Sequence, residues 1–149
     1  MFWPSAYDGG FPLQTYAWRN SYYVVSAVSS KRAHVIDKLG QVVATSSHFT
    51  RLLVHQVDLD AQVFHVDYNA AKLRELMLRR GGDLTVRALD EESVFALESS
   101  RPDVSVADLA RELGLETFRE YHLRLGREQA RYREASRRAD PATAAADGR

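Results

Sequence analysis

The chain has 149 residues, of which 45% are hydrophobic and 27% are charged, a mixture typical of a globular protein rather than a disordered or fibrous one. Lysine plus arginine equals aspartate plus glutamate, 20 against 20, so the whole chain lacks the charge excess that drives nonspecific binding to nucleic acid or anionic lipid. It contains no cysteine, which excludes disulfides, thiolate metal sites and a cysteine nucleophile within this sequence. No apolar run approaches the about 20 residues that span a bilayer, and the N-terminus does not resemble a secretory signal, so we expect a cytoplasmic protein without a membrane partner.

The first half of the chain is predicted to consist of short strands and one helix. The strands are apolar runs rich in β-branched and aromatic residues, at 2–4, 22–28, 33–37, 41–45 and 52–59. A turn cluster at 7–10 precedes the helix, which is expected from about Pro12 to Asn20. Gly40 lies between the third and fourth strands, where a positive φ would close a hairpin.

Helical spacing and capping signals dominate the second half. A helix is predicted from a cap at Asp67 or Asn69 to about Arg80, and a second hairpin is predicted from strands at 84–89 and 94–99. Two capping boxes, Ser105 with Asp108 and Thr117 with Glu120, then announce two helices separated by Gly114.

These elements predict a mixed α/β fold with a helical extension. We expect one unit over residues 1–99, a helical C-terminal arm over 100–138 and a frayed tail over 139–149.

Four segments in order resemble parts of the carbon–nitrogen hydrolases, the nitrilase superfamily. Phe2-Trp3-Pro4-Ser5-Ala6 is similar to the strand and loop that follow the nucleophile in that family, and residues 17–25 are similar to its helix-to-strand passage. In that passage Tyr16 and Arg19 stand where the family usually has arginine and glutamate. Residues 34–44, His-Val-Ile-Asp-Lys-Leu-Gly-Gln-Val-Val-Ala, resemble the family's Ile-Ile-Asp-x-x-Gly-x-Val-Leu-Ala hairpin, and residues 57–60 resemble its closing strand.

The resemblance implies the second half of an αββα sandwich and the hydrolysis of nonpeptide carbon–nitrogen bonds in nitriles or amides, without a cofactor. The family's cysteine nucleophile, glutamate base and lysine all precede the segment that Phe2-Trp3-Pro4 resembles, so no catalytic residue is expected in this chain. We therefore expect a truncated form that is inactive alone and that associates either with itself or with a missing N-terminal half. The loop residues Ser5, Ala6 and Tyr7 are the candidates for lining the substrate pocket, although a plain turn would have the same sequence.

The last helix could also mediate association. In this family, C-terminal segments often reach another subunit, and Phe118, Tyr121 and Leu125 would present an apolar face for that purpose.

A cluster of potential metal ligands occurs between residues 55 and 67. Its members are His55, Asp58, Asp60, His65 and Asp67. On a strand His55 would point away from Asp58 and Asp60, and acidic residues before a helix usually cap it or face water, so we predict no metal site.

The second hypothesis, from a different functional class, is a noncatalytic interaction or helix-turn-helix DNA-binding module at 105–138. Residues 106–115 resemble the first helix and turn of such a motif, and residues 117–138 carry seven arginines against three glutamates. Glu120 occupies the position where the second helix should bury an apolar side chain, which makes nucleic acid an unlikely partner. Solvated arginines on a packing helix would give the same pattern.

Overall fold

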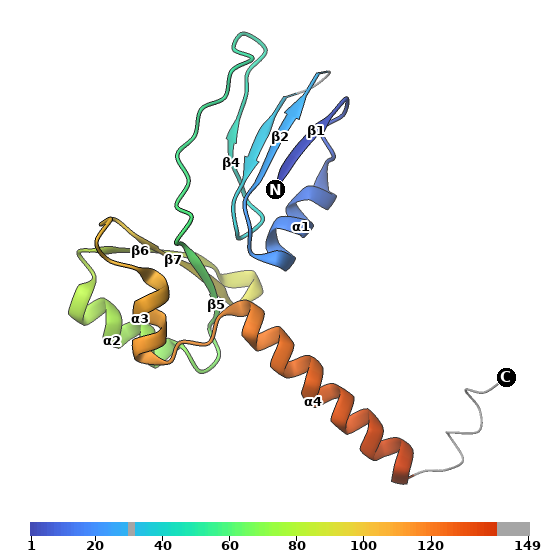
Figure 1. Cartoon of the computed structure of the whole chain (residues 1–149), viewed down its shortest axis with the longest axis vertical. Helices are drawn as coiled ribbons and strands as arrows, with labels where there is room; N and C mark the ends of the chain where they lie inside the picture. The colour runs from blue at the N-terminus through green and yellow to red at the C-terminus, as the bar shows by residue number, and fades with distance from the viewer. Residues whose placement is uncertain (30–31, 140–149) are drawn as a thin grey trace, which may run out of the picture.

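The computed structural model describes residues 1–29 and 32–139, which form two small β-sheets with helices packed on them (Figure 1). The strand order is β1-β2-β3-β4 in the first sheet and β5-β7-β6 in the second. The mixed α/β class predicted from the sequence is confirmed. In Figure 1 the last helix, α4, projects away from both sheets.

The first sheet combines a parallel strand pair with an antiparallel hairpin. Its elements are β1 Phe2–Ser5, α1 Phe11–Asn20, β2 Val24–Val28, β3 His34–Ile36 and β4 Val42–Thr45. β1 and β2 run parallel with α1 as the crossover, and the pairs β2–β3 and β3–β4 are antiparallel. Leu13 and Ala17 of α1 pack on Val24 and Ile36, and together these four buried side chains form the core between helix and sheet.

The turn between β3 and β4 is the glycine turn that the sequence predicts. Gly40 adopts φ +77°, and a Cβ atom there would lie 2.8 Å from the carbonyl oxygen of Gln14 in α1. Glycine therefore satisfies two demands, the left-handed backbone and the close approach of the turn to the helix.

The second sheet is entirely antiparallel, with β7 in its centre. Its strands are β5 Gln62–His65, β6 Leu84–Leu89 and β7 Val94–Ser99. The chain between and after these strands forms α2 Ala70–Arg80, the 3-10 turn η1 Asp90–Glu92 and α3 Val106–Leu113. The helices α2 and α3 cover one face of this sheet. The buried residues there are Phe64, Leu76, Leu84, Phe95, Leu97, Val104, Val106, Leu109, Ala110 and Leu115.

The chain crosses the edge of the second sheet before α4 begins. Thr117 makes an isolated antiparallel bridge to Phe64 on the edge strand β5. α4, Phe118–Ala139, then starts on the opposite face. There Phe118 is buried with Val63, Ala96 and other apolar side chains, including Leu39 from the β3–β4 turn. This second cluster therefore contains side chains from both halves of the molecule and is one of the contacts between the two sheets.

One expectation from the sequence is wrong. Residues 52–59 form no strand; they run without a ladder partner among the described residues, with Leu52 and Val54 74% and 82% exposed, and the sheet begins instead at Gln62. α3, which follows the unit boundary predicted after residue 99, shares one core with β5–β7.

The β3–β4 turn of the first sheet meets one face of the second. The helical C-terminal extension is present as α4, whereas the tail predicted at 139–149 lies outside the described residues from 140 on.

Within the described residues, no helix combines the length and the apolar character needed to traverse a bilayer.

Candidate functional site

The loop that follows β1 holds the three residues predicted to line a substrate pocket. Ser5 ends the strand, and its Oγ accepts a hydrogen bond from the backbone N–H of Tyr7 at 3.2 Å. Ala6 and Tyr7 lie on the surface, and the Tyr7 side chain is 71% exposed. The structure therefore presents this loop to solvent at the C-terminal end of a parallel strand, where α/β folds commonly place ligand-binding loops.

A buried ion pair links the two sheets. The carboxylate of Asp37, fully buried in the β3–β4 turn, accepts the backbone N–H groups of Leu39 and Gln41 at 2.9 Å each and the Nη1 of Arg87 at 2.8 Å. Arg87 lies on β6 of the other sheet and also contacts Glu98, with 2.9 Å between Nη2 and Oε1. Partial burial of the guanidinium disfavours its charged form and acts to lower the pKa of Arg87. The carboxylates of Asp37 and Glu98 favour the charged form more strongly, so the pKa is raised.

Lys38, next to Asp37, inserts its ammonium group among carbonyl oxygens. Its Nζ donates to the carbonyl oxygen of Leu59 at 3.0 Å and to that of Ala61. Burial lowers the pKa of Lys38, while the negative charges of Asp58 and Asp60 act in the opposite direction. The β3–β4 turn is thereby attached to the segment that enters β5.

Two of the three aspartates among the potential metal ligands at 55–67, Asp58 and Asp60, bind backbone groups. The carboxylate of Asp60 accepts the N–H of Val106 at 2.5 Å, at the N-terminus of α3, where a negative charge is favourable. Asp58 accepts the N–H of Asp60 at 2.9 Å and that of Ser99 at 3.3 Å. His55 is exposed on the same segment.

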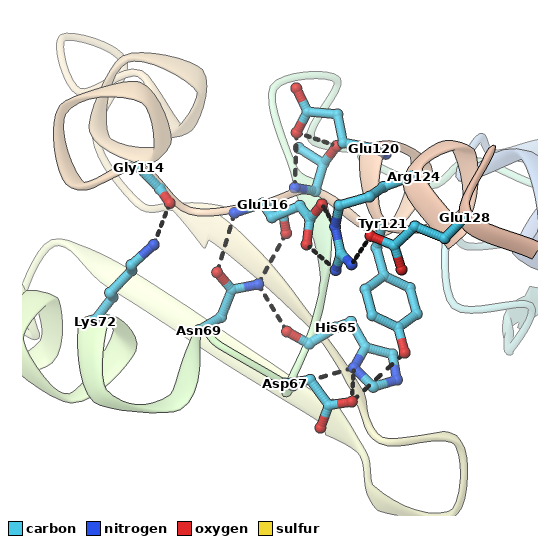
Figure 2. A network of polar contacts seen from close by, with 11 residues as sticks. His65, Asp67, Asn69, Lys72, Gly114, Glu116, Glu120, Tyr121, Arg124 and Glu128 are labelled. Carbon is cyan, nitrogen blue, oxygen red and sulfur yellow. Dashed lines mark hydrogen bonds and ion pairs between the residues drawn. The ribbon is translucent and has the colours of Figure 1, made fainter. Parts of the chain in front are cut away.

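The other two members of that cluster contact the base of α4 (Figure 2). The ring of His65 stacks on Tyr121, with 4.1 Å between ring centroids and 8° between planes. His65 Nδ1 accepts the N–H of Asp67 at 3.1 Å and lies 3.5 Å from its carboxylate, which also accepts the Tyr121 hydroxyl at 3.5 Å. The five residues thus occupy separate places rather than one shared site.

A buried asparagine fixes the turn between α3 and α4. The side chain of Asn69, fully buried, donates from Nδ2 to the carbonyl oxygens of His65 and Glu116 at 2.8 Å each and accepts the N–H of Glu116 at 3.0 Å (Figure 2). Lys72 of α2 adds a hydrogen bond to the carbonyl oxygen of Gly114. Asn69 was predicted as a helix cap; it occupies that position, but its side chain makes no capping bond and instead connects two distant segments.

Arg124 connects the beginning of α4 to the segment that joins α3 and α4. Its Nε and Nη2 donate to the two carboxylate oxygens of Glu116 at 2.8 and 2.9 Å, and its Nη1 reaches Glu128 at 3.3 Å. The guanidinium also lies 5.3 Å from the ring centroid of Tyr121. The hydrogen bonds from Arg124 lower the pKa of Glu116, against a smaller effect of burial.

The ion pair between Glu116 and Arg124 is expected to contribute to stability in a pH-dependent way. Because the folded-state pKa of Glu116 is depressed, the contribution is present above its unfolded pKa of about 4.3 and is lost as the pH falls through the folded value. We expect the free energy of unfolding of Arg124→Gln to fall below that of the wild type at pH 7, and the difference to shrink below about pH 4. Arg127→Gln, an exposed position on the same helix, should show no such trend, and a gap that persists at low pH would contradict the assignment.

The residues predicted to form an intermolecular face on α4 are largely engaged within the chain. Phe118 is 3% exposed against the second sheet, and Tyr121 stacks on His65. α3 and α4 also differ from a helix-turn-helix, in which both helices share one core, because they pack on opposite faces of the second sheet.

Comparison with protein-family models, with curated proteins and with solved structures found no match.

The charged and polar groups described above bond chiefly to one another or to backbone. Such an arrangement holds elements in place: Asp37 and Arg87 join the sheets, and Asn69, Glu116 and Arg124 fix the origin of α4. No local pattern in the sequence indicates these contacts. Asp37 belongs to the hairpin motif at 34–44, and its ion-pair partner lies fifty positions away.

Proposed function

We propose that this chain is the C-terminal half of a carbon–nitrogen hydrolase, acting on nitriles or amides when combined with a half that supplies glutamate, lysine and cysteine. By itself it would be inactive. The proposal rests first on the resemblance of residues 1–60 to that family. The feature of the fold that best supports it is the uncovered apolar face of the first sheet.

Side chains alternate between the two faces of this sheet. Val24 points toward α1, so Val25 and Ala27 point to the opposite face, together with their parallel partners Phe2 and Pro4. Phe2 is 84% exposed, and Pro4 and Ala27 are also exposed. A sheet with a helix on one face and exposed apolar residues on the other is what one half of an αββα sandwich would present to its second layer.

The position of the Ser5–Tyr7 loop agrees with this proposal. It leaves β1 on the surface, where a preceding half could bring a nucleophile beside it. In the family, this loop borders the substrate pocket, so we assign Ser5, Ala6 and Tyr7 to substrate contact.

The test is to read the DNA immediately upstream of the Met1 codon, in frame or across a single frameshift, and to express the joined polypeptide. We expect a glutamate, a lysine and a cysteine just before Phe2, release of ammonia from an amide or nitrile, and loss of that activity on replacing the cysteine by alanine. Phe2→Asp should abolish the activity by placing a charge in the sandwich interior, whereas Leu78→Asp, at an 82% exposed position on α2, should retain it. Stop codons without these residues, or ammonia release by the chain alone, would reject the proposal.

A further inference from the structure

A small pocket lies where the end of α1, the β3–β4 turn, the start of β5 and the start of α4 come together (Figure 1). Its volume is about 190 Å³, below the roughly 300 Å³ at which pockets for drug-sized ligands begin, so it suits an ion or a small polar molecule. Two cationic side chains, Lys38 and Arg119, line it, and of the described residues in its wall none is acidic. The pocket therefore carries an excess of positive charge within a chain of zero net charge.

Arg119 supplies one of the two charges from the first turn of α4. It is exposed and forms no ion pair with the described residues. Its guanidinium carries five N–H donors in a planar fork that matches the oxygens of an anion. The neighbouring acid, Glu120, is engaged with Thr117, whose backbone N–H and hydroxyl it accepts at 2.8 and 2.7 Å. Arg119 thus brings an unused set of donors to the pocket.

Lys38 supplies the second charge from the first sheet. Its ammonium group has three N–H donors and gives two of them to the carbonyl oxygens of Leu59 and Ala61. Burial lowers the pKa of Lys38 because the charged form is disfavoured, and an anion in the pocket would offset that penalty. The carboxylates of Asp58 and Asp60 also act on Lys38, but they do not line the pocket and accept backbone N–H groups outside it.

A hydroxyl group in the pocket wall lacks a partner. Ser21, at the C-terminal end of α1, has a buried hydroxyl oxygen that makes no hydrogen bond within the described part of the chain. Buried polar groups in folded proteins almost always have such a partner. Rotation about the Cα–Cβ bond of Ser21 would direct this hydroxyl to an acceptor oxygen held in the pocket.

We propose that this pocket binds a phosphate group, with Arg119 and Lys38 as its cationic contacts and Ser21 as a hydroxyl donor. Two positive charges match the charge of about −1.5 to −2 that a phosphate monoester carries at pH 7, whereas a carboxylate carries a single charge. Donors that approach from α1, from the β3–β4 turn and from α4 suit a tetrahedral anion better than a planar one. The inference does not depend on the hydrolase proposal, because α1, about 15 Å long, separates the pocket from the Ser5–Tyr7 loop.

The test is isothermal titration calorimetry of the full chain with inorganic phosphate, at neutral pH and fixed ionic strength. We expect one phosphate to bind per chain. Arg119→Gln should raise the dissociation constant about tenfold or more, because it removes charge-assisted hydrogen bonds to the anion without breaking an ion pair among the described residues. Arg74→Gln, which removes the same charge at an exposed position on α2, is the matched control and should leave the dissociation constant unchanged.

Lys38→Gln tests the second cationic contact and should also raise the dissociation constant about tenfold or more. This substitution disturbs the bonds to Leu59 and Ala61 as well, so far-UV circular dichroism must show that the variant is folded. If it does not fold, the comparison of Arg119→Gln with Arg74→Gln decides the question.

Two further ligands identify the chemistry that the pocket recognises. Acetate, with one charge, should bind about tenfold more weakly than phosphate or not at all. Glycerol phosphate distinguishes the source of the group: an affinity similar to that of phosphate would assign the pocket to a phosphate monoester, and its exclusion would assign the pocket to the free ion.

The inference would be overturned by a wild-type chain that does not bind phosphate at millimolar concentration, which would leave the pocket to water. An unchanged dissociation constant in Arg119→Gln, an equal loss of affinity in Arg74→Gln, or acetate that binds as tightly as phosphate would overturn it as well.

Discussion

Replacing Asp37 by alanine is expected to lower the free energy of unfolding by about 3–5 kcal/mol, the range for removing one partner of a buried ion pair. The carboxylate is fully buried and accepts two backbone N–H groups of its own turn as well as the Arg87 guanidinium. Without it, these donors lose their acceptor in a site with little access to water. The penalty therefore combines two unsatisfied amides with a guanidinium that keeps only one of its two carboxylate partners, Glu98.

Urea unfolding followed by circular dichroism measures this effect. Asp90→Ala, an exposed aspartate without an ion-pair partner in the described part of the chain, is the control and should change stability by less than about 0.5 kcal/mol. The double variant Asp37→Ala with Arg87→Met should be less destabilised than the sum of the single variants, because both single variants lose the same Asp37–Arg87 interaction. A loss below about 1 kcal/mol for Asp37→Ala would contradict the role assigned to the pair.

The same variant should also weaken the coupling between the sheets. Trp3 lies on β1 in the core of the first sheet and Trp18 lies on α1 at the contact between the sheets, whereas most of the helical residues belong to α2, α3 and α4 and dominate the circular dichroism. We expect fluorescence and circular dichroism transitions that coincide in the wild type to separate in Asp37→Ala.

Elements encoded by local signals were predicted correctly. Ser105 accepts the N–H of Asp108 at 3.3 Å, and Thr117 and Glu120 exchange both bonds of a capping box, as their spacing indicates. Gly40 adopts the predicted positive φ. In each case, residues a few positions apart determine the backbone, so the sequence contains the whole signal.

Strand pairing was less predictable because it depends on distant partners. The run at 52–59 has the stronger β pattern, yet the shorter Gln62–His65 forms the strand because β7 is available beside it. The packing of α3, within the helical arm predicted at 100–138, could not be predicted for a related reason: amphipathic spacing shows that a helix has a buried face without showing against which element.

The contacts that position α4 could be predicted only in part. The helix and its capping box follow from the sequence, but the stacking of His65 on Tyr121 and the bonds of Asn69 join residues about fifty positions apart. A histidine or asparagine before a helix is more often a local cap or a surface residue, and nothing in the local pattern distinguishes these cases.

Asn69→Ala is expected to cost about 2–4 kcal/mol, because several buried polar groups lose their partner at once. The Nδ2 group satisfies the carbonyl oxygens of His65 and Glu116, and Oδ1 satisfies the N–H of Glu116. Asn20→Ala is the matched control: Asn20 is exposed, and within the described residues its side chain bonds only the carbonyl oxygen of Tyr16 in its own helix, so the change should cost well below about 1 kcal/mol. Equal losses for the two variants in urea unfolding would contradict the assigned role.

Asn69→Asp separates hydrogen bonding from side-chain shape. The substitution keeps an acceptor for the N–H of Glu116 but directs a carboxylate oxygen at two carbonyl oxygens that now lack a donor. Burial beside these oxygens raises the pKa of the new carboxyl in the folded state, so the folded state binds more protons than the unfolded one. The destabilisation relative to the wild type should therefore increase from pH 4 to pH 7, whereas that of Asn69→Ala should stay constant. A pH-independent loss for Asn69→Asp would mean that its carboxyl reaches water, and the α3–α4 turn would then be held by side-chain packing rather than by the bonds of Asn69.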